Sequence, residues 1–453
     1  MIKKITYLTA VLCTVSTMAM ADTLNDVLSY TYENSLTVTA ERAGLKAKDE
    51  GVAKAKAGYR PTVQAEGSIG RSRNDLEYEG LLGKDKRTQT PKDASISFVQ
   101  PVFSGLTTYN SVQAAKNQVR SGRFVLKNTE QATLLDAAAV YMDVIRDKDV
   151  LDLQINNEKV LRRHLESYKK RFNAGELTRT DVAQAEARLA GATANRIAAE
   201  GNLEVSKAQF FSVVGIEPKN LQDVQVKDLE IMLPKSVAEA IDMALKENPK
   251  VKAAHYAEQA AISTVSAQKG TLSPSVDIKG AAGKQKESMT IKDNEYWQIT
   301  ANLTVPIYQA GYEYASVREA KQLANQYRIL LAKTRQDVRA ETTAAWEQYT
   351  ATKAQISSIK SQIKASKIAL DGVIREMNVG SRTVLDVLDA EQEHLDNQVS
   401  LTKVHRDEIV SAFTLLSAVG QMNPRGLNLG VDTYNPEVYY DTIQSKWIGW
   451  GID

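Results

Sequence analysis

Histidine and cysteine, common ligands of transition metals, are scarce in this sequence of 453 residues, with four histidines and one cysteine. Glu391 and His394 form one Glu-x-x-His pair, a spacing that di-iron bundle proteins use, but such sites need a second copy and further glutamates. The sequence has no second copy, and its four histidines are scattered: His164, His255, His394 and His405. We therefore predict no metal site and no cofactor.

Common catalytic motifs are also missing. The sequence contains no Walker loop, no dinucleotide fingerprint, no HExxH and no GxSxG. The only cysteine, Cys13, lies in an N-terminal segment that we expect to be removed. Disulfides, thiolate metal sites and cysteine nucleophiles are then excluded from the rest of the chain. We predict that the protein is not an enzyme.

Two aspartates, Asp386 and Asp389, are the charged pair with the clearest functional meaning. They are three residues apart and share one face of the helix predicted after Gly380. Acidic side chains early in a helix usually stabilise its dipole. From the residues alone, this stabilising role is the favoured interpretation.

The elements that must position these aspartates occur twice in the chain. SVQAAK at Ser111–Lys116 recurs as SVREAK at Ser316–Lys321. Further pairs keep the same offset: Pro101 with Pro306, Gly175 with Gly380, and Asp181 with Asp386. Such a long constant register indicates an internal duplication.

Each copy is predicted to contain a helix, a β-hairpin, a very long helix, a turn and another helix. The opening helices are expected at residues 24–58 and 237–270, and the hairpins at 62–103 and 275–307. From Trp297 to Ile307 apolar and polar residues alternate, as in a strand between an apolar and an aqueous environment. An extra segment between Arg71 and Asp93 predicts an exposed loop.

After the hairpins the hydrophobic period becomes helical. No proline occurs between Leu106 and Asn173, and a helix of that length would extend about 100 Å. Val112, Val119 and Leu126 follow heptad spacing, which predicts left-handed supercoiling against neighbouring helices. A rod of this length is not needed by a globular core.

The N-terminus predicts export. Lys3 and Lys4 precede an apolar run, and Ala19-Met20-Ala21 fits a signal peptidase site. The whole chain has 57 Lys+Arg and 55 Asp+Glu, so the remainder without Lys3 and Lys4 is balanced. This balance gives no nucleic-acid footprint. Because no apolar run is long enough for a transmembrane helix, a membrane crossing would require β-strands.

We divide the chain into five predicted segments. They are a signal peptide (1–21), a first repeat (22–217), a linker (218–236), a second repeat (237–425) and a C-terminal tail (426–453).

Four strands per chain are too few for a membrane barrel, since about eight is the smallest number seen. Three chains would supply twelve strands and an interior wide enough for cargo. Aromatic residues lie where strands meet helices and at the far end of the last strand, as at membrane interfaces. They are Tyr59, Phe103, Tyr109, Tyr308, Tyr312 and Tyr314, with Tyr296 and Trp297 at the far end. Ordinary helix–sheet packing would also explain them.

Several motifs resemble those of a known family. They are QPVFSG at Gln100–Gly105, VPIYQAG at Val305–Gly311, VGSRTVLDVLDA at Val379–Ala390, and the prolines at strand entrances, Pro61, Pro101, Pro274 and Pro306. With the duplicated unit, they resemble the TolC family of outer-membrane efflux proteins over nearly the whole mature chain.

The resemblance implies a mainly α-helical homotrimer. A twelve-stranded β-barrel in the outer-membrane lipid would continue into a long α-helical barrel in the periplasm. The trimer would be the passive exit duct of a tripartite system for type I protein secretion, small-molecule efflux or both. Its partners would be an ABC or RND inner-membrane transporter and a periplasmic adaptor, with no nucleic acid. The linker and tail would pack around the waist of the helical barrel.

The resemblance also assigns roles at the periplasmic entrance. Asp386 and Asp389 of three chains would form an acidic selectivity ring. The residues that close the entrance would be Arg382, Asp181, Thr180 and Met377, next to the tip turns at Gly175 and Gly380. Met377 stands where the family has a gating tyrosine and cannot donate a hydrogen bond, so we hypothesise easier opening.

One alternative remains, a periplasmic coiled-coil scaffold or adaptor without a pore. It would explain the long helices but not two duplicated hairpins with membrane-type alternation.

Overall fold

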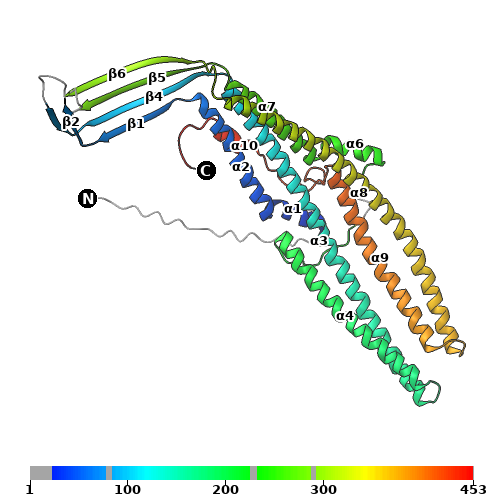
Figure 1. Ribbon diagram of the computed structural model, residues 1–453. Helices are drawn as coiled ribbons and strands as arrows, with labels where there is room; N and C mark the ends of the chain where they lie inside the picture. The colour runs from blue at the N-terminus through cyan, green and yellow to red at the C-terminus, as the bar shows by residue number, and fades with distance from the viewer. Residues whose placement is uncertain (1–22, 78–83, 225–231, 287–291, 452–453) are drawn as a thin grey trace.

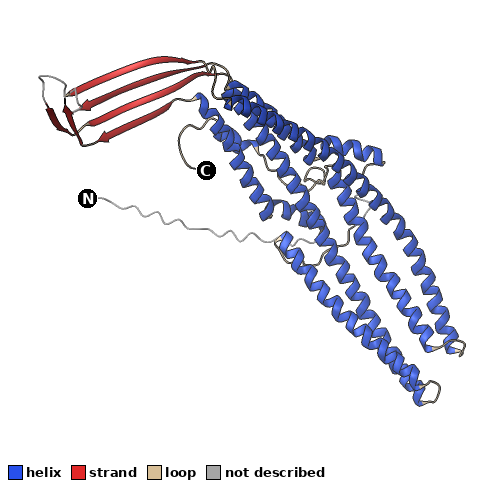
Figure 2. Ribbon diagram, in the orientation of Figure 1, coloured by secondary structure: helices blue, strands red, loops and turns tan. Residues whose placement is uncertain are grey.

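The computed structural model describes residues 23–77, 84–224, 232–286 and 292–451. The predicted signal peptide lies outside the described residues. The molecule is elongated, with a β-sheet at one end and long helices that extend away from it (Figures 1 and 2).

Four antiparallel strands form the sheet. They are β1 (Thr62–Ile69), β4 (Lys92–Ser104), β5 (Ser275–Lys286) and β6 (Asp293–Thr304). Their order is β1-β4-β5-β6, so the hairpins of the two repeats join through β4 and β5. Within the chain, β1 and β6 are the edges of this sheet.

The segment predicted as a loop contains two further strands, which corrects that prediction. β2 (Ser72–Glu77) and β3 (Lys84–Gln89) pair as a separate antiparallel sheet at the far end of the hairpin. The sequence did not reveal them because neither strand has an alternating apolar face. Backbone pairing alone does not need such a face.

The apolar residues of the larger sheet lie on one face and are exposed. Trp297 is 79% exposed, and Val63, Ile96, Ile299 and Leu303 are also exposed. Contiguous exposed apolar surface on this scale marks a face that meets another apolar phase or partner.

The four prolines occupy different positions relative to the strands. Pro61 and Pro274 come directly before β1 and β5. Pro101 lies inside β4 instead, at an irregularity in its pairing with β5, and beyond the last residue paired with β1. Pro306 follows the end of β6. A proline has no N–H for a ladder, so it fits these ends and irregular positions.

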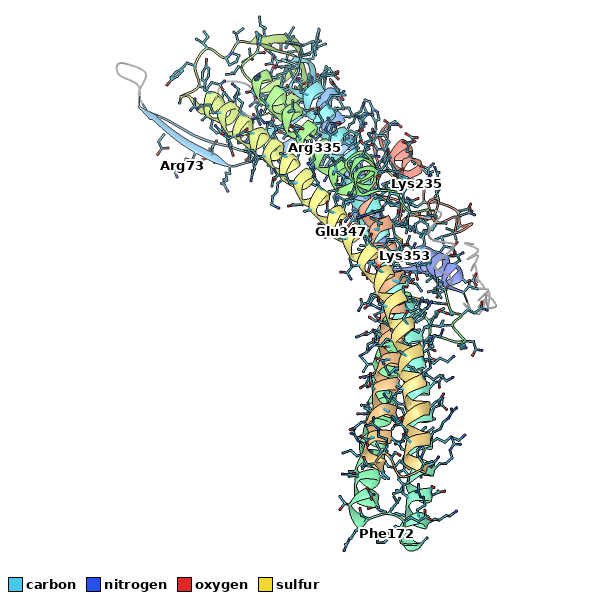
Figure 3. The ribbon with its side chains drawn as sticks, turned by 90° about the vertical axis from the view of Figure 1, so that its right-hand side faces the viewer. Arg73, Phe172, Lys235, Arg335, Glu347 and Lys353 are labelled. Atoms are coloured by element: carbon cyan, nitrogen blue, oxygen red, sulfur yellow. The ribbon has the colours of Figure 1, made fainter. Side chains whose placement is uncertain are left out.

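Two helical hairpins form the rod. Their members are α3 (Thr107–Asn173) with α4 (Arg179–Val214), and α8 (Tyr312–Asn378) with α9 (Val384–Ala418). α3 and α8 each have 67 residues, which corresponds to about 100 Å of helix. The hairpins lie side by side, and α8 changes direction near Glu347 and Lys353 (Figures 1 and 3). None of the helices in the described ranges is long and apolar enough to span a membrane.

Each opening helix is split in two, where a single helix was predicted. The pieces are α1 (Leu24–Asn34) and α2 (Leu36–Lys56), then α6 (Val237–Glu247) and α7 (Pro249–Gly270). Ser35 and Asn248 leave helical geometry and cap the second piece with their side chains. A proline disfavours helical backbone at the residue before it, which explains the break before Pro249. A 3₁₀ turn, Ala57–Tyr59, connects α2 to the sheet.

The two repeats meet closely where the sheet becomes helix. A Cβ atom on Gly105 would lie 2.2 Å from the carbonyl oxygen of Gly270, and Gly105 has a φ of +60°. Both the space and the backbone conformation therefore require glycine at Gly105.

The largest core forms the waist of the rod. Tyr141, Phe210 and Phe413 are fully buried there, from α3, α4 and α9. Linker residues Leu221 and Leu233 pack against this core, as do tail residues that include Leu427 and Leu429. Tail helix α10 (Glu437–Ile443) lies against α2.

Candidate functional site

The two helical hairpins end in matching turns at the tip of the rod. Gly175 and Gly380 have φ values of +79° and +81°. In each turn the following residue donates its N–H to a carbonyl five residues earlier: Glu176 to Arg171 and Ser381 to Glu376, both at 2.9 Å. This helix ending needs a left-handed residue, for which glycine has the lowest cost. Figure 3 places Phe172 at this extremity.

Matching capping boxes follow the turns. Asp386 Oδ2 accepts hydrogen bonds from the backbone N–H and the hydroxyl of Thr383, both at 2.8 Å. Asp181 receives the same two bonds from Thr178, at 2.9 and 2.7 Å. The Thr383 backbone bond and then the hydroxyl bond lower the pKa of Asp386. Asp386 therefore remains charged at neutral pH while it also starts α9.

Asp389 has a cationic partner that the sequence analysis did not find. The Arg188 guanidinium, on α4, donates to Asp389 Oδ1 on α9. Arg188 is seven residues after Asp181 and thus two turns further along the same face of α4, which is the signal that could have identified it. Of the acidic pair, Asp386 therefore takes part in a helix cap, and Asp389 takes part in an ion pair.

Arg382 pairs within its own turn. Its Nε donates to Glu376 Oε2 at 3.1 Å, and both side chains are about half exposed. Asp181 is engaged in its cap, and Thr180 is exposed. Within one chain, the structure therefore does not bring Arg382 and Asp181 together.

Met377 is buried, with 8% of its surface exposed. It belongs to a tip core with Tyr168, Val384 and Leu388. Its sulfur accepts a hydrogen bond from Arg171 at 3.3 Å. Met377 thus contributes to packing and accepts a bond, although it cannot donate one as a tyrosine would.

The Glu-x-x-His pair does not converge on one point. Glu391 contacts His164 of α3, with Oε1 and Nε2 2.8 Å apart, whereas His394 Nδ1 lies 3.0 Å from the Ser366 hydroxyl of α8. Burial, and then the charge of Glu391, raises the pKa of Tyr168 to about 12. Across the described ranges, no group of three or more His, Cys, Asp or Glu side chains could hold a metal ion.

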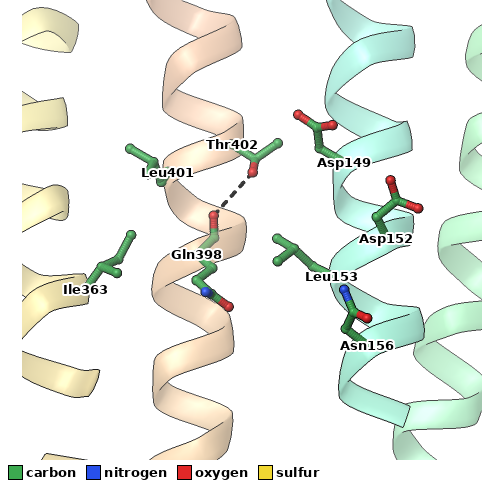
Figure 4. A pocket seen from close by; sticks show the side chains of 8 residues that line it. All are labelled: Asp149, Asp152, Leu153, Asn156, Ile363, Gln398, Leu401 and Thr402. Atoms are coloured by element: carbon green, nitrogen blue, oxygen red, sulfur yellow. Dashed lines mark hydrogen bonds between the residues drawn. The ribbon is translucent and has the colours of Figure 1, made fainter. Parts of the chain in front are cut away.

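A groove on the flank of the rod carries a second acidic pair. Asp149 and Asp152 of α3 lie there opposite Gln398 and Thr402 of α9 (Figure 4). The open volume is about 400 Å³. Burial, followed by repulsion from Asp223 and Asp152, raises the pKa of Asp149. No basic side chain lines this groove.

Comparison with known families identifies the architecture. Residues 27–215 and 240–421 match the family model described as outer membrane efflux protein. The chain belongs to the outer membrane efflux protein family. Its two matched segments fall on the two copies of the duplicated unit.

Several relatives of this family are similar over most of the chain. Outer membrane efflux protein BepC of Brucella suis is 34% identical over 95% of this chain and 92% of BepC. Outer membrane protein TolC of Vibrio cholerae is 25% identical over 92% of this chain and 95% of TolC. Alkaline protease secretion protein AprF of Pseudomonas aeruginosa is 22% identical over 80% of this chain and 76% of AprF.

Solved structures of outer-membrane channels share the fold. The Campylobacter jejuni CmeC outer membrane channel has a TM-score of 0.80, covering 93% of this chain and 89% of that chain at 13% identity.

The matches confirm the resemblance to the TolC family and the mainly helical fold with two repeats and a small sheet. Members of the outer membrane efflux protein family are passive conduits in the outer membrane with a periplasmic helical part. The protein is thus an outer-membrane export channel protein and not an enzyme. The matches favour the channel over the scaffold or adaptor alternative.

Proposed function

We propose that three copies of this chain form the exit duct of a tripartite export system. The observation that carries this proposal is the four-stranded sheet with an exposed apolar face and two edges, placed at one end of a helical rod of about 100 Å. A single copy leaves the two edges of its sheet unpaired, and its rod supplies only part of a helical barrel.

Trimerisation would pair the free strand edges. β1 of one copy would join β6 of the next, so that three four-stranded sheets close into a twelve-stranded barrel. Open edges favour this pairing because their N–H and C=O groups need partners in lipid. The outward side chains of Val63, Trp297 and Ile299 would then face lipid.

The duct would receive cargo from an inner-membrane transporter of the ABC or RND type through a periplasmic adaptor. The length of α3 and α8 supports this arrangement, because a rod of about 100 Å extends far from the sheet. The efflux and protease-secretion names of the relatives support small molecules and proteins as cargo. The two repeats (22–217 and 237–425) would each contribute one helical hairpin. The linker and the start of the tail (426–453), with Leu427 and Leu429, would form the equatorial waist.

The tip would form a gated entrance with an acidic ring. Each of three copies would contribute the Asp386 carboxylate, which has no cationic partner of its own in the capping box and whose charge the Thr383 cap maintains. Asp389 would add less charge than a bare carboxylate, because Arg188 pairs with it. Arg382, Asp181, Thr180 and Met377 would lie around the entrance, and the hypothesis of easier opening at Met377 stays a hypothesis.

Single-channel conductance in planar bilayers tests the proposal directly. The wild-type trimer is expected to form cation-selective pores that a multivalent cation blocks, because like charges focus the potential. The variant with Asp386→Asn and Asp389→Asn should lose most of this selectivity and block. The matched control is Asp149→Asn with Asp152→Asn, which removes the same charge from the flank.

Two outcomes would contradict the proposal. Failure of the folded chain to form trimers would exclude the duct, and equal block of wild type and tip variant would exclude the acidic entrance.

A further inference from the structure

The end of the C-terminal tail is held beside the start of the sheet. Lys56 Nζ donates to the backbone and side-chain oxygens of Gln444, at 3.2 and 3.1 Å. Arg60 donates to the backbone oxygen of Lys446 at 2.8 Å. Since Pro61 and then β1 follow Arg60 directly, this part of the tail lies at the junction between helices and strands. Figure 1 shows the C-terminal end near this junction.

Three large apolar side chains at this point are exposed. Trp447, Ile448 and Trp450 are 66%, 90% and 97% exposed. Trp447 stacks on the Arg60 guanidinium, 4.8 Å from the ring centroid. Gly449 between them has a φ of +117°, a conformation that other residues rarely adopt. Neighbouring exposed side chains of this size mark an interaction surface.

Further aromatic residues of the junction are exposed as well. Tyr59, Phe103, Tyr308 and Tyr312 are all exposed where strands meet helices. In a protein whose sheet lies in the outer membrane, this junction is the level of the periplasmic interface. Tryptophan prefers this level because its ring is apolar and its N–H remains hydrated.

Basic groups surround the exposed side chains. Lys56 and Arg60 both donate to the tail, at Gln444 and Lys446. Lys446 in turn donates to the backbone oxygen of Gly451 at 2.9 Å. Among the described tail residues, Glu437 pairs with Arg123, and Asp441 accepts a hydrogen bond from Gln444. Aromatic and cationic groups together match the boundary between acyl chains and lipid phosphates.

We propose that Trp447, Ile448 and Trp450 insert into the periplasmic leaflet of the outer membrane, while Lys56, Arg60 and Lys446 face its phosphates. The tail then acts as an interfacial clip that sets the depth of the sheet in the bilayer. This inference rests on the proposed membrane position of the sheet. The charge complementarity with phosphate favours lipid over a second copy of the chain as the occupant.

Tryptophan fluorescence can test this contact in the intact trimer. The chain has four tryptophans, so Trp297→Phe with Trp346→Phe leaves only the two in the tail. This variant is reconstituted in phosphatidylethanolamine–phosphatidylglycerol vesicles whose acyl chains are brominated near the headgroup. We expect at least a twofold loss of fluorescence, and a smaller loss when the bromines are near the bilayer centre.

A matched variant retains only Trp346, which packs against the waist core. It should show no such loss. Quenching of the tail tryptophans that is no greater than quenching of Trp346 would overturn the inference.

A second measurement distinguishes lipid from a neighbouring subunit. Trp447→Ala, Ile448→Ala and Trp450→Ala together should leave the dissociation temperature of the trimer in detergent unchanged. A marked fall of that temperature would show that the tail joins subunits and would overturn the lipid contact. Because both measurements use trimers with normal conductance, failure of the clip is distinguishable from failure of the proposed channel.

Discussion

Asp386 has two tasks at the residue scale. Its carboxylate completes the capping box of α9, and the same carboxylate is the proposed charge of the entrance. The cap lowers its pKa, so one interaction secures both the helix start and the charge. Asp389 differs, because Arg188 reduces its effect on the local potential.

Arg188→Ala is expected to increase cation selectivity and the affinity of a multivalent blocker. Removing the guanidinium leaves the charge of Asp389 uncompensated. The attraction between this charge and a close cation is roughly 1 kcal/mol in water, so the affinity of the blocker should rise roughly fivefold. Blocker titration in planar bilayers measures this effect. Arg196→Ala, further along α4, is the control, since Arg196 pairs with Glu158 of α3 and Glu200 of α4. Unchanged block in Arg188→Ala would contradict the role of this ion pair.

Asp49 is a buried carboxylate that makes stability depend on pH. Its side chain is 1% exposed, and Oδ1 has no hydrogen-bond partner. Burial raises its pKa to about 6, partly offset by Arg123. A raised pKa favours the neutral acid in the fold, so stability falls as the pH rises from about 4 through about 6.

Asp49→Asn should therefore stabilise the protein at pH 7.5 and have little effect at pH 4. The expected gain is roughly 1 to 3 kcal/mol, because each unit of the pKa shift corresponds to about 1.4 kcal/mol. Thermal unfolding followed by circular dichroism measures it. Glu41→Gln, at an ion pair with Lys48, is the control. Equal gains at both pH values would show that charge burial is not the cause.

At the element scale, turns and caps position the tip. Both repeats have the same turn and the same capping box. The turns are at Gly175 and Gly380, and the boxes begin at Thr178 and Thr383. The hairpins differ in their side chains: Phe172 is exposed at the first turn, and the matching Met377 is buried. The duplicated backbone thus supports unequal surfaces.

Thr383→Ala should weaken both the helix start and the charge of Asp386. Loss of an N-cap hydroxyl costs about 1 kcal/mol. The wild-type carboxylate, with its lowered pKa, loses charge only when the pH falls below the usual aspartate range. Without the Thr383 hydroxyl its pKa rises, so cation selectivity should disappear at higher pH than in the wild type.

Selectivity measured as a function of pH tests this shift, and Thr178→Ala is the matched control at the other turn. If both variants titrate like the wild type, the cap does not set the charge of Asp386.

At the scale of the whole molecule, assembly depends on the strand edges. Val63 near the start of β1 and Leu303 near the end of β6 are exposed, and antiparallel joining of copies would bring these ends together. The absence of cysteine after Cys13 makes disulfide mapping clean.

Val63→Cys combined in turn with Leu303→Cys and Ala301→Cys should yield covalent dimers and trimers on mild oxidation. A disulfide requires Cα atoms within about 7 Å, so only neighbouring strand ends can react. Non-reducing gel electrophoresis of membranes measures the products. Val63→Cys alone is one control, and its combination with Trp297→Cys, far along β6, is the other. If no pair crosslinks in folded protein, β1 and β6 do not join copies.

Local patterns in the sequence determined a large part of this protein. The duplication, the alternation from Trp297 and the proline-free stretch to Asn173 identified the main strands and the long helices. Gly175 and Gly380 marked the turns, because glycine at a helix end reflects a local backbone requirement. These signals depend on residues that are close in sequence, so they are readable without neighbours.

Only the tertiary structure decided which side chains meet. Arg188 reaches Asp389, and Met377 enters the tip core. The tail meets Arg60 although nearly the whole chain separates them. β2 and β3 and the helix break at Ser35 also lacked a decisive local pattern. Such contacts depend on the packing of distant segments, which no period within one segment encodes.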